Sequence, residues 1–470
     1  MFLSTRAISL LCLVSATAVN CHKKNRYIVP GATCAHAGGI VESDGTWYWF
    51  GQNERVEDTA LFSGINVYSS SDLLNWDYRG RALSPINGTD ISSDRVVERP
   101  KTVFNTATQE WVLWFHADNS SYGLLRQGVA TSPNVTGPYT FQDTFSPLGG
   151  TSQDFGLFQD VDGESYALYS NGDADAAHDN LITRMNANYT NVDEVVYTFF
   201  DFDLEAPTIL YTGKRYYILM SHKTGYRPNN VVVFSAEKLA GPWSVQSYIT
   251  ASGTRTFNSQ STMTIAVAGS HETAFIYCGD QWSTSKDLYD SRYIWLPVNI
   301  NDHTGSFTVA WHDLYTIDTQ TGKVEYPQGT VYEAEHGLVT GSAYATICVR
   351  CSRNPFIVAG NATLTLQNIV GTGKPQWVSF YYHNPDGLFG DNRGVSGQSF
   401  VIARFATVSV NGGAPVTLRQ RSGNAGIIFS QPLNVTFHFG GKNSISISGL
   451  NGAAASDLDK IVVYGNIYDD

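Results

Sequence analysis

One strand signature occurs five times between residues 46 and 280 of this chain. A repeat of roughly 50–60 residues that holds several short strands is typical of a β-propeller. The pattern predicts an all-β fold that begins with a five-bladed β-propeller, with units at 35–95, 96–150, 151–203, 204–257 and 258–318. The five copies of the signature are T-W-Y-W-F-G (46–51), E-W-V-L-W-F-H (110–116), E-S-Y-A-L-Y-S (164–170), R-Y-Y-I-L-M-S (215–221) and E-T-A-F-I-Y-C-G (272–279).

One polar residue stands just upstream of each copy, and these residues are His36, Glu98, Asp154, Glu205 and Gln260. The first strand of a propeller blade lines the central channel, so five equivalent positions are expected to point into one funnel. Such a set of polar side chains is more typical of a catalytic site than of a core. We therefore interpret the funnel as an active site. For any one of these carboxylates taken alone, a capping or turn role is the alternative.

The composition agrees with turn-rich β-structure, since 13% of residues are aromatic, 15% are charged and 43 are glycine. The formal net charge of −12 disfavours nucleic acid as a partner. Of the cysteines, Cys348 and Cys351 are spaced to bridge a tight loop, and Cys21 is within reach of Cys34. Cys278 lies in a strand pattern and is expected to be a free core thiol.

The N-terminus predicts a signal peptide over 1–18. Arg6 precedes the apolar stretch Ala7–Val14, and Ala16-Thr17-Ala18 supplies an A-x-A cleavage site. The apolar stretch is too short to span a bilayer, so we expect a secreted, extracellular protein with no membrane partner. Sequons for N-glycosylation agree with this route, at Asn87, Asn119, Asn134, Asn188, Asn361 and Asn434.

A second pattern begins after the propeller. Thr319–Thr330 is polar, contains Gly and Pro, and is predicted to be a linker. From 331 to 470, alternating runs such as T-L-T-L, W-V-S-F-Y-Y and K-I-V-V-Y predict one β-sandwich of the jelly-roll type. The expected order is a signal peptide (1–18), a catalytic propeller (19–318), a linker (319–330) and a sandwich module (331–470).

Carboxylates that converge in a channel suit glycoside hydrolysis, which needs a protonated acid and a second group that activates water. Glu205 is the expected acid. Its neighbours Leu204, Ala206 and Pro207 limit its hydration, and an apolar wall raises the pKa of a carboxyl group. Asp154 is expected to raise the pKa of that acid further by like-charge coupling.

The same residues carry a resemblance to a known family. The first half resembles glycoside hydrolase family 43, a five-bladed β-propeller, through S-x-D-L-x-N-W (70–76), E-R-P-K (98–101), D-x-x-L-F-x-D-x-D-G (154–163) and E-A-P (205–207). The resemblance implies that Glu205 is the general acid and that Asp154 orients it and modulates its pKa. Family members usually present a base Asp in the first unit, where this chain reads A-H-A-G-G-I with His36.

The motifs A-H-x-G-G-I, E-R-P-K and S-Q-S-T are similar to the fungal exo-β-1,3-galactanase subgroup. This implies β-1,3-galactan, the backbone of arabinogalactan, as substrate and partner. With no carboxylate in the first unit, Glu98 and Gln260 are the candidates to activate water. Glu98 is the stronger base by ordinary chemistry, and Arg99 beside it is expected to face away by strand alternation. The resemblance favours Gln260, through a relay or its imidic acid tautomer, with Glu98 holding the sugar.

The second half resembles carbohydrate-binding module family 35. Glu333 and Glu335 are two apart in a strand pattern, so they are predicted to share a face. With Asp459 they would supply the oxygen ligands that a structural Ca²⁺ prefers, and an exposed E-x-E is the alternative. Tyr344 and Asp457 are predicted galactose contacts from loops of this module.

Sugar contacts are also expected in the first half. Tyr122 and Trp282 follow strands there and are predicted to stack on galactose, although aromatics in a propeller are more often core. His36 is predicted to be a hydrogen-bonding wall residue at the substrate, because no second His stands at metal-ligand spacing.

The function predicted from these observations is a secreted, monomeric, inverting exo-β-1,3-galactanase that releases galactose or short galacto-oligosaccharides. The alternatives among enzymes are α-L-arabinofuranosidase and β-xylosidase. Outside enzymes, the alternative is a non-catalytic galactan-binding lectin, because the usual base is missing.

Overall fold

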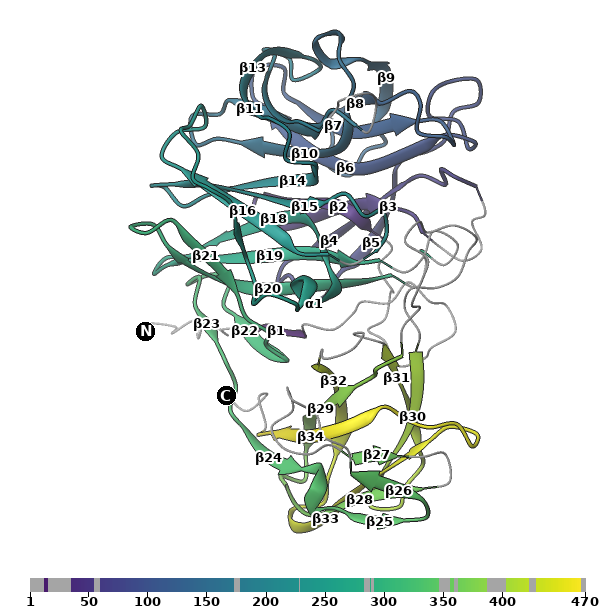
Figure 1. Cartoon of the computed structure of the whole chain (residues 1–470). Coiled ribbons are helices and arrows are strands. Elements are labelled where there is room, and N and C mark those ends of the chain that lie inside the picture. Colours follow the sequence, from purple (N-terminus) through teal and green to yellow (C-terminus); the bar gives the residue numbers. More distant parts are fainter. Residues whose placement is uncertain are drawn as a thin grey trace, which may run out of the picture. The chain divides into compact units, whose positions relative to one another are not determined.

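The computed structural model consists almost entirely of β-strands (Figure 1), which confirms the prediction of an all-β protein. Helix in the described residues is confined to the short turns η1 (Pro147–Gly149), α1 (Arg255–Asn258) and η3 (Ala334–His336) and to Leu288. The structure describes residues 12–15, 35–54, 60–172, 178–227, 229–282, 288, 291–345, 356–358, 362–386, 403–421 and 428–465.

The chain divides into two compact units. The first contains the described parts of Ala18–Trp311 and Ile317–Val324, and the second those of His312–Thr316 and Glu325–Asp470. The domain boundaries predicted from the sequence at 318 and 330 stay predictions. A three-stranded sheet is formed by β1 (Cys12–Ser15), β22 (Leu314–Ile317) and β23 (Val324–Glu325).

Among its described residues, the first unit contains five four-stranded antiparallel sheets, each made of four strands that are consecutive in the chain. The repeated signatures of the sequence are the second strands of these sheets. The first two sheets are β2 (His36–Ser43), β3 (Thr46–Gln52), β4 (Ile65–Ser70) and β5 (Asp77–Leu83), then β6 (Val96–Asn105), β7 (Glu110–Asp118), β8 (Arg126–Ser132) and β9 (Thr140–Phe145). The other three are β10 (Gln153–Gln159), β11 (Ser165–Ser170), β12 (Asn180–Met185) and β13 (Val192–Phe199), then β14 (Leu204–Tyr211), β15 (Tyr216–His222), β16 (Val231–Ala236) and β17 (Ser247–Tyr248), and finally β18 (Gln260–Ala268), β19 (Thr273–Gln281), β20 (Arg292–Asn301) and β21 (Ser306–Val309).

The first strands of the five sheets pack against one another. Each contacts the first strand of the next sheet, and β18 contacts β2. At Gly156 of β10 a Cβ atom would lie 2.1 Å from the carbonyl oxygen of Pro207 in β14, so this approach requires glycine. Between the fifth and first sheets, the ring of Trp49 lies 4.8 Å from Tyr293 and 5.1 Å from Trp295. The five first strands therefore surround one centre.

A β-bulge interrupts each first strand near its start. The pairing register shifts between His36 and Gly39, Glu98 and Lys101, Gln153 and Gly156, Glu205 and Thr208, and Ser261 and Met263. A bulge sets two residues of one strand opposite one residue of its partner. In four of the strands a residue at the bulge has a left-handed backbone, namely Ala37 (φ 51°), Arg99 (φ 52°), Asp154 (φ 53°) and Ala206 (φ 56°).

The register corrects one of the predicted equivalences. Counted back three residues from the first residue paired after each shift, the equivalent positions are His36, Glu98, Gln153, Glu205 and Gln260. The third equivalent position is therefore Gln153, and Asp154 is the bulge residue that follows it. The prediction that Asp154 is the third equivalent position was wrong by one residue, because a bulge adds a residue that strand alternation does not reveal.

The second unit holds two antiparallel sheets that share one hydrophobic core, including Leu364 and Ile445 from one sheet and Phe380 and Ile461 from the other. One sheet contains β24 (Gly329–Glu333), β26 (Ala343–Ala345), β27 (Phe356–Val358), β29 (Pro375–His383), β32 (Ile428–Thr436) and β34 (Asp457–Tyr464). The other contains β25 (Leu338–Thr340), β28 (Thr363–Gly371), β30 (Ala403–Val410), β31 (Val416–Arg421) and β33 (Gly440–Gly449).

None of the helices in the described part of the chain is long and apolar enough to cross a membrane. Cys278 is a free, buried thiol, as predicted. The pairs Cys21 with Cys34 and Cys348 with Cys351 lie outside the described residues.

Candidate active site

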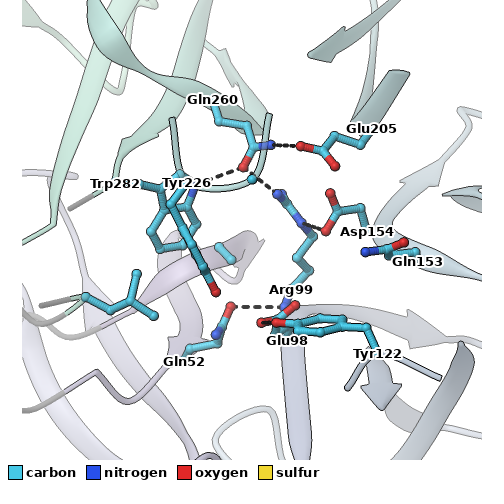
Figure 2. A pocket seen from close by; sticks show the side chains of 13 residues that line it. Gln52, Glu98, Arg99, Tyr122, Gln153, Asp154, Glu205, Tyr226, Gln260 and Trp282 are labelled. Carbon is cyan, nitrogen blue, oxygen red and sulfur yellow. Dashed lines mark hydrogen bonds and ion pairs between the residues drawn. The ribbon is translucent and has the colours of Figure 1, made fainter. Parts of the chain in front are cut away.

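The five first strands line one pocket of about 270 Å³ in the first unit (Figure 2). The strands contribute Ala37, Glu98, Arg99, Gln153, Asp154, Glu205 and Gln260. Neighbouring strand ends and loops add Gln52, Tyr122, Gly225, Tyr226, Trp282 and Leu288. The structure therefore brings together all of the predicted catalytic residues and both aromatics predicted to contact sugar in the first half.

The bulges decide which side chains reach this pocket. In a regular strand Arg99 would face away from Glu98, as strand alternation predicts, but both residues line the pocket. Gln153 and Asp154 do the same in the third sheet. The prediction for Arg99 is wrong because the left-handed backbone at this residue breaks the alternation.

Arg99 is a buried cation at the middle of the site (Figure 2). Its Nε donates a hydrogen bond to Oδ1 of Asp154, and its Nη2 donates one to Oε1 of Gln260, each at 2.7 Å. Burial acts to raise the pKa of Asp154, but the charge and hydrogen bond of Arg99 act to lower it. The charge of His116 and a hydrogen bond with Glu205 act in the same direction, so the pKa of Asp154 is lowered overall. Asp154 is therefore a carboxylate at neutral pH.

Glu205 has the surroundings of a proton donor. It is 8% exposed and stands between the buried residues Leu204 and Ala206. Its carboxyl group interacts with the ionised Asp154 and contributes to the lowered pKa of that residue. Burial and a neighbouring negative charge both favour the protonated form of a carboxyl group. The arrangement sets a buried carboxyl group beside an ionised one, a pairing that suits separate roles in acid–base catalysis.

Gln260 has all four hydrogen-bonding positions of its amide occupied. Its Nε2 donates to Oε1 of Glu205 at 2.8 Å and to Oγ of Ser221 at 3.0 Å. Its Oε1 accepts from Arg99 at 2.7 Å and from Nε1 of Trp282 at 2.8 Å. Arg99 and Trp282 can only donate, so the orientation of the amide is fixed. Gln260 therefore contacts Glu205 through Nε2, and its Oε1, polarised by Arg99 and Trp282, lies on the side away from Glu205.

Glu98 lies across Arg99 from Glu205 in the pocket (Figure 2). The hydroxyl of Tyr122 donates to its Oε1 at 2.7 Å. Nδ1 of His116 lies 3.5 Å from its Oε2, an ion-pair contact too long for a hydrogen bond. These two groups hold the carboxylate in place, and its side chain keeps 16% exposure toward the pocket.

Other pocket residues were missed by sequence reasoning. Gln52 accepts a hydrogen bond from the backbone nitrogen of Arg99 at 3.3 Å, and it pairs in register with His36. Tyr226 lies edge-on to Trp282, with ring centroids 5.5 Å apart, and hydrogen-bonds with Tyr122. Gln52 directly follows the first repeated strand, so the sequence held a signal for it. Tyr226 comes from a loop outside the repeat, where no pattern indicates its direction.

His36 does not reach the pocket surface, which corrects the prediction that it borders the substrate. It is fully buried, its Nδ1 lies 3.0 Å from Oδ1 of Asp280, and its ring stacks on Tyr293 at 4.4 Å. Asp280 also accepts a hydrogen bond from the backbone nitrogen of Ala37 at 2.9 Å. His36 therefore joins the first sheet to the fifth behind Trp282, whose ring is 5.7 Å away.

The predicted calcium ligands are not brought together in this arrangement. Among the described residues, Glu98, His116 and Asp154 offer ligand atoms within 4.8 Å of one another, and Glu333, Glu335 and Asp459 do not form such a group. Glu335 lies in η3 rather than on β24, so the shared strand face predicted for Glu333 and Glu335 is wrong. The turn into η3 ends the strand alternation at Glu333. We assign no metal to the first group, because Arg99 already neutralises Asp154.

The two contacts predicted in the second unit have different surroundings. Tyr344 is in β26 and is 65% exposed. Asp457 is the first residue of β34, is 4% exposed and lies 3.4 Å from Nδ1 of His383. Neither is in a loop, which corrects that part of the prediction, and Asp457 is too buried in this structure to contact a ligand.

Comparison with known proteins agrees with this geometry. Residues 39–282 match the model of glycosyl hydrolases family 43. A crystal structure of exo-β-1,3-galactanase from Phanerochaete chrysosporium with galactose is 36% identical and superposes with a TM-score of 0.84, covering 95% of this chain and 100% of that one. A variant of that enzyme with β-1,3-galactotriose is 36% identical with a TM-score of 0.85, covering 96% of this chain and 100% of that one.

A more distant match shows the fold alone. An exo-β-1,3-galactanase from Clostridium thermocellum is 22% identical with a TM-score of 0.60, covering 90% of this chain and 100% of that one. No curated protein sequence matches the chain. The family match covers the strands that build the pocket, and the pocket holds the buried carboxyl group of Glu205 beside the ionised Asp154. The chain therefore belongs to glycosyl hydrolases family 43 and is a glycoside hydrolase.

Proposed function

We propose that this protein is a secreted, inverting exo-β-1,3-galactanase that releases galactose or short galacto-oligosaccharides from β-1,3-galactan. The observation that carries the proposal is the pocket in which Glu205, Asp154, Arg99 and Gln260 form one hydrogen-bonded group. Galactose and β-1,3-galactotriose in the crystal structures of the Phanerochaete chrysosporium enzyme support the choice of substrate.

The proposed architecture is a five-bladed β-propeller followed by a jelly-roll carbohydrate-binding module of family 35. Five sheets whose first strands meet around one pocket support the propeller. Two sheets around one core support the module. The pocket volume of about 270 Å³ is just below the range of roughly 300–1,000 Å³ typical of small-molecule sites. A pocket of this size suits the terminal sugar of a chain rather than a long internal segment, which favours exo-action.

In the proposed reaction, Glu205 gives its proton to the glycosidic oxygen as the bond to the anomeric carbon breaks. Asp154 and Arg99 remain an ion pair and keep that carboxyl group oriented. Arg99 cannot serve as the acid, because a guanidinium stays charged in proteins. Glu98, fixed by Tyr122 and His116, accepts a hydrogen bond from a sugar hydroxyl.

The attacking water is assigned to Gln260. Arg99 and Trp282 polarise its Oε1, and its Nε2 touches Glu205 at 2.8 Å. When Oε1 takes a proton from the water, Nε2 can pass one to the carboxylate of Glu205, which restores the acid and leaves an imidic acid tautomer. One of the two donors must leave Oε1 for the water to bind. Glu98 is the alternative base, but its two carboxylate oxygens are already engaged by Tyr122 and His116.

The second unit is proposed to bind galactan. Tyr344 is 65% exposed in β26. An exposed aromatic ring suits the face of a sugar ring. We expect Tyr344→Ala to weaken binding to insoluble galactan in a pull-down assay. Turnover of short oligosaccharides should be unchanged, and an equal loss in both assays would contradict a separate binding role.

Secretion, glycosylation and calcium are proposed on the sequence and the resemblance alone. N-terminal sequencing of the mature protein should begin at about Val19, and an intact N-terminus would exclude the signal peptide.

The carboxylates of Glu333, Glu335 and Asp459 do not converge in this structure, so no step of the proposed reaction depends on calcium. A melting temperature that EDTA leaves unchanged would exclude a structural Ca²⁺ in the module.

The substrate is tested by comparing sugar release from three polymers. We expect galactose from β-1,3-galactan and no release from arabinan or xylan. Cleavage of aryl α-L-arabinofuranoside or xylan with galactan untouched would favour the other activities of the family. Binding to galactan without any release of reducing sugar would favour a lectin.

A further inference from the structure

His116 and Asp118 stand behind the pocket carboxylate Glu98, and both are fully buried. His116 is the register partner of Glu98 across β6 and β7. Its Nε2 lies 3.1 Å from Oδ2 of Asp118, and its Nδ1 lies 3.5 Å from Oε2 of Glu98. The imidazole thus bridges two carboxylates, one in the interior and one at the pocket.

Asp118 also builds the loop that reaches back to Glu98. Its carboxylate accepts hydrogen bonds from the backbone nitrogens of Asn119 (2.8 Å), Leu124 (2.7 Å) and Leu125 (3.2 Å). Tyr122 is at the centre of that loop, and its hydroxyl donates to Glu98 at 2.7 Å. The same buried carboxylate therefore supports both groups that hold Glu98.

The charges around His116 favour its protonated form. Burial acts to lower the pKa of His116, but the hydrogen bond with Asp118 and the charges of Asp118 and Glu98 raise it from 6.5 to about 9. A group with a raised pKa keeps its charge below the ordinary value and loses it as the pH rises through the raised one. His116 is therefore a cation at neutral pH and becomes neutral near pH 9.

The other elements around His116 add both signs of charge. Strand β6 presents Arg99, which is paired with Asp154 of β10. Strand β8 places the neutral Gln127 opposite His116. Beyond Glu98, burial and then the charge of Glu98 raise the pKa of Glu54 to about 7. Arg99 also interacts with the charge of Glu98, but its guanidinium is hydrogen-bonded to Asp154 and Gln260.

We propose that His116 is a positioning residue for the reaction, a buried cation fixed by Asp118 that holds the Glu98 carboxylate toward a sugar hydroxyl. This rests on the proposed function of the pocket. It adds a reason for activity to fall at alkaline pH that is separate from the acid Glu205. A purely structural role for His116 would affect folding stability but would not give a pH dependence with the titration of this ring.

The charge of His116 is tested first without substrate. In isotope-labelled wild-type protein, NMR titration of the His116 ring should show its transition near pH 9. In Asp118→Asn, the amide oxygen still accepts backbone hydrogen bonds but the negative partner is gone, so the transition should move toward 6.5. A wild-type transition near 6.5 would overturn the proposal. Because the measurement on wild type needs no variant to fold, it stands even if Asp118→Asn is unstable.

The role in turnover is tested by kcat/KM on β-1,3-linked galacto-oligosaccharide from pH 5 to 10. The alkaline limb should move to lower pH in Asp118→Asn. In His116→Gln, kcat/KM at neutral pH should fall about 10- to 100-fold, comparable with the loss of a residue that orients a site ligand.

The control is His178→Gln, which should keep the wild-type pH profile. This change removes a surface ion pair with Asp203, in which the two side chains are 44% and 58% exposed. A loss by one constant factor at every pH in Asp118→Asn would overturn the positioning role. An inactive wild-type enzyme whose His116 titrates near pH 9 would overturn the substrate assignment while supporting the charged His116.

Discussion

Glu205→Gln is expected to remove nearly all hydrolysis of β-1,3-galactan. The amide keeps the size of the side chain, and its oxygen can still accept the hydrogen bond from Nε2 of Gln260, so the hydrogen-bonded group should persist. It cannot give a proton to the leaving oxygen, and one positioned acid contributes on the order of 10²–10⁴-fold to the rate. The measurement is kcat/KM on galacto-oligosaccharide, compared with wild type at the same pH.

The matched control is Glu164→Gln, because Glu164 is exposed and outside the pocket lining. This variant should keep wild-type activity. The melting temperatures of both variants should stay close to that of wild type, which separates loss of chemistry from loss of folding. If Glu205→Gln kept activity within about threefold of wild type, Glu205 could not be the acid.

The second large effect is expected for Gln260→Ala. Removing the amide takes away the proposed water-binding oxygen, and it leaves Ser221 and Trp282 without the partners that they have now. Arg99 also loses the acceptor on the side opposite Asp154. We expect a loss of about 10²-fold or more in kcat, within the range of a general base. Binding of galactose should change less, because Glu98 and Tyr122 are untouched.

Gln159→Ala is the control for this change, since Gln159 is exposed at the other end of β10. It should leave kcat unchanged. A fully active Gln260→Ala would contradict the assignment of water to Gln260. Glu98→Gln would then have to abolish activity, because Glu98 is the other candidate to accept the proton.

The sequence was sufficient for the strands and for the set of catalytic candidates. The five repeats fall on β3, β7, β11, β15 and β19, and the polar residues upstream of them fall at the pocket except for His36. What the sequence could not provide is the local backbone geometry. Strand alternation assigns one face to each residue, and the bulges in the first strands set Arg99 beside Glu98 and Asp154 beside Gln153.

His36 shows a second limit of sequence reasoning. It occupies the position equivalent to Glu98 and Glu205, so the pattern placed it at the substrate. Asp280, from a distant part of the chain, instead draws the ring into the interior, and Tyr293 stacks on it. A polar residue at a site position is therefore a candidate until its long-range partners are known. The support of Glu98 by His116 is of the same kind, because only the pairing of β6 with β7 reveals it.

The most direct test of the account follows the anomeric proton of galactose by NMR from the first minute of incubation with β-1,3-galactan. An acid and a water on opposite faces of the sugar invert the configuration, so we expect α-galactose first, followed by slow mutarotation to the β-anomer. Release of β-galactose at the start would contradict the inverting scheme and the role of Gln260 in it. No galactose at all would contradict the proposed function.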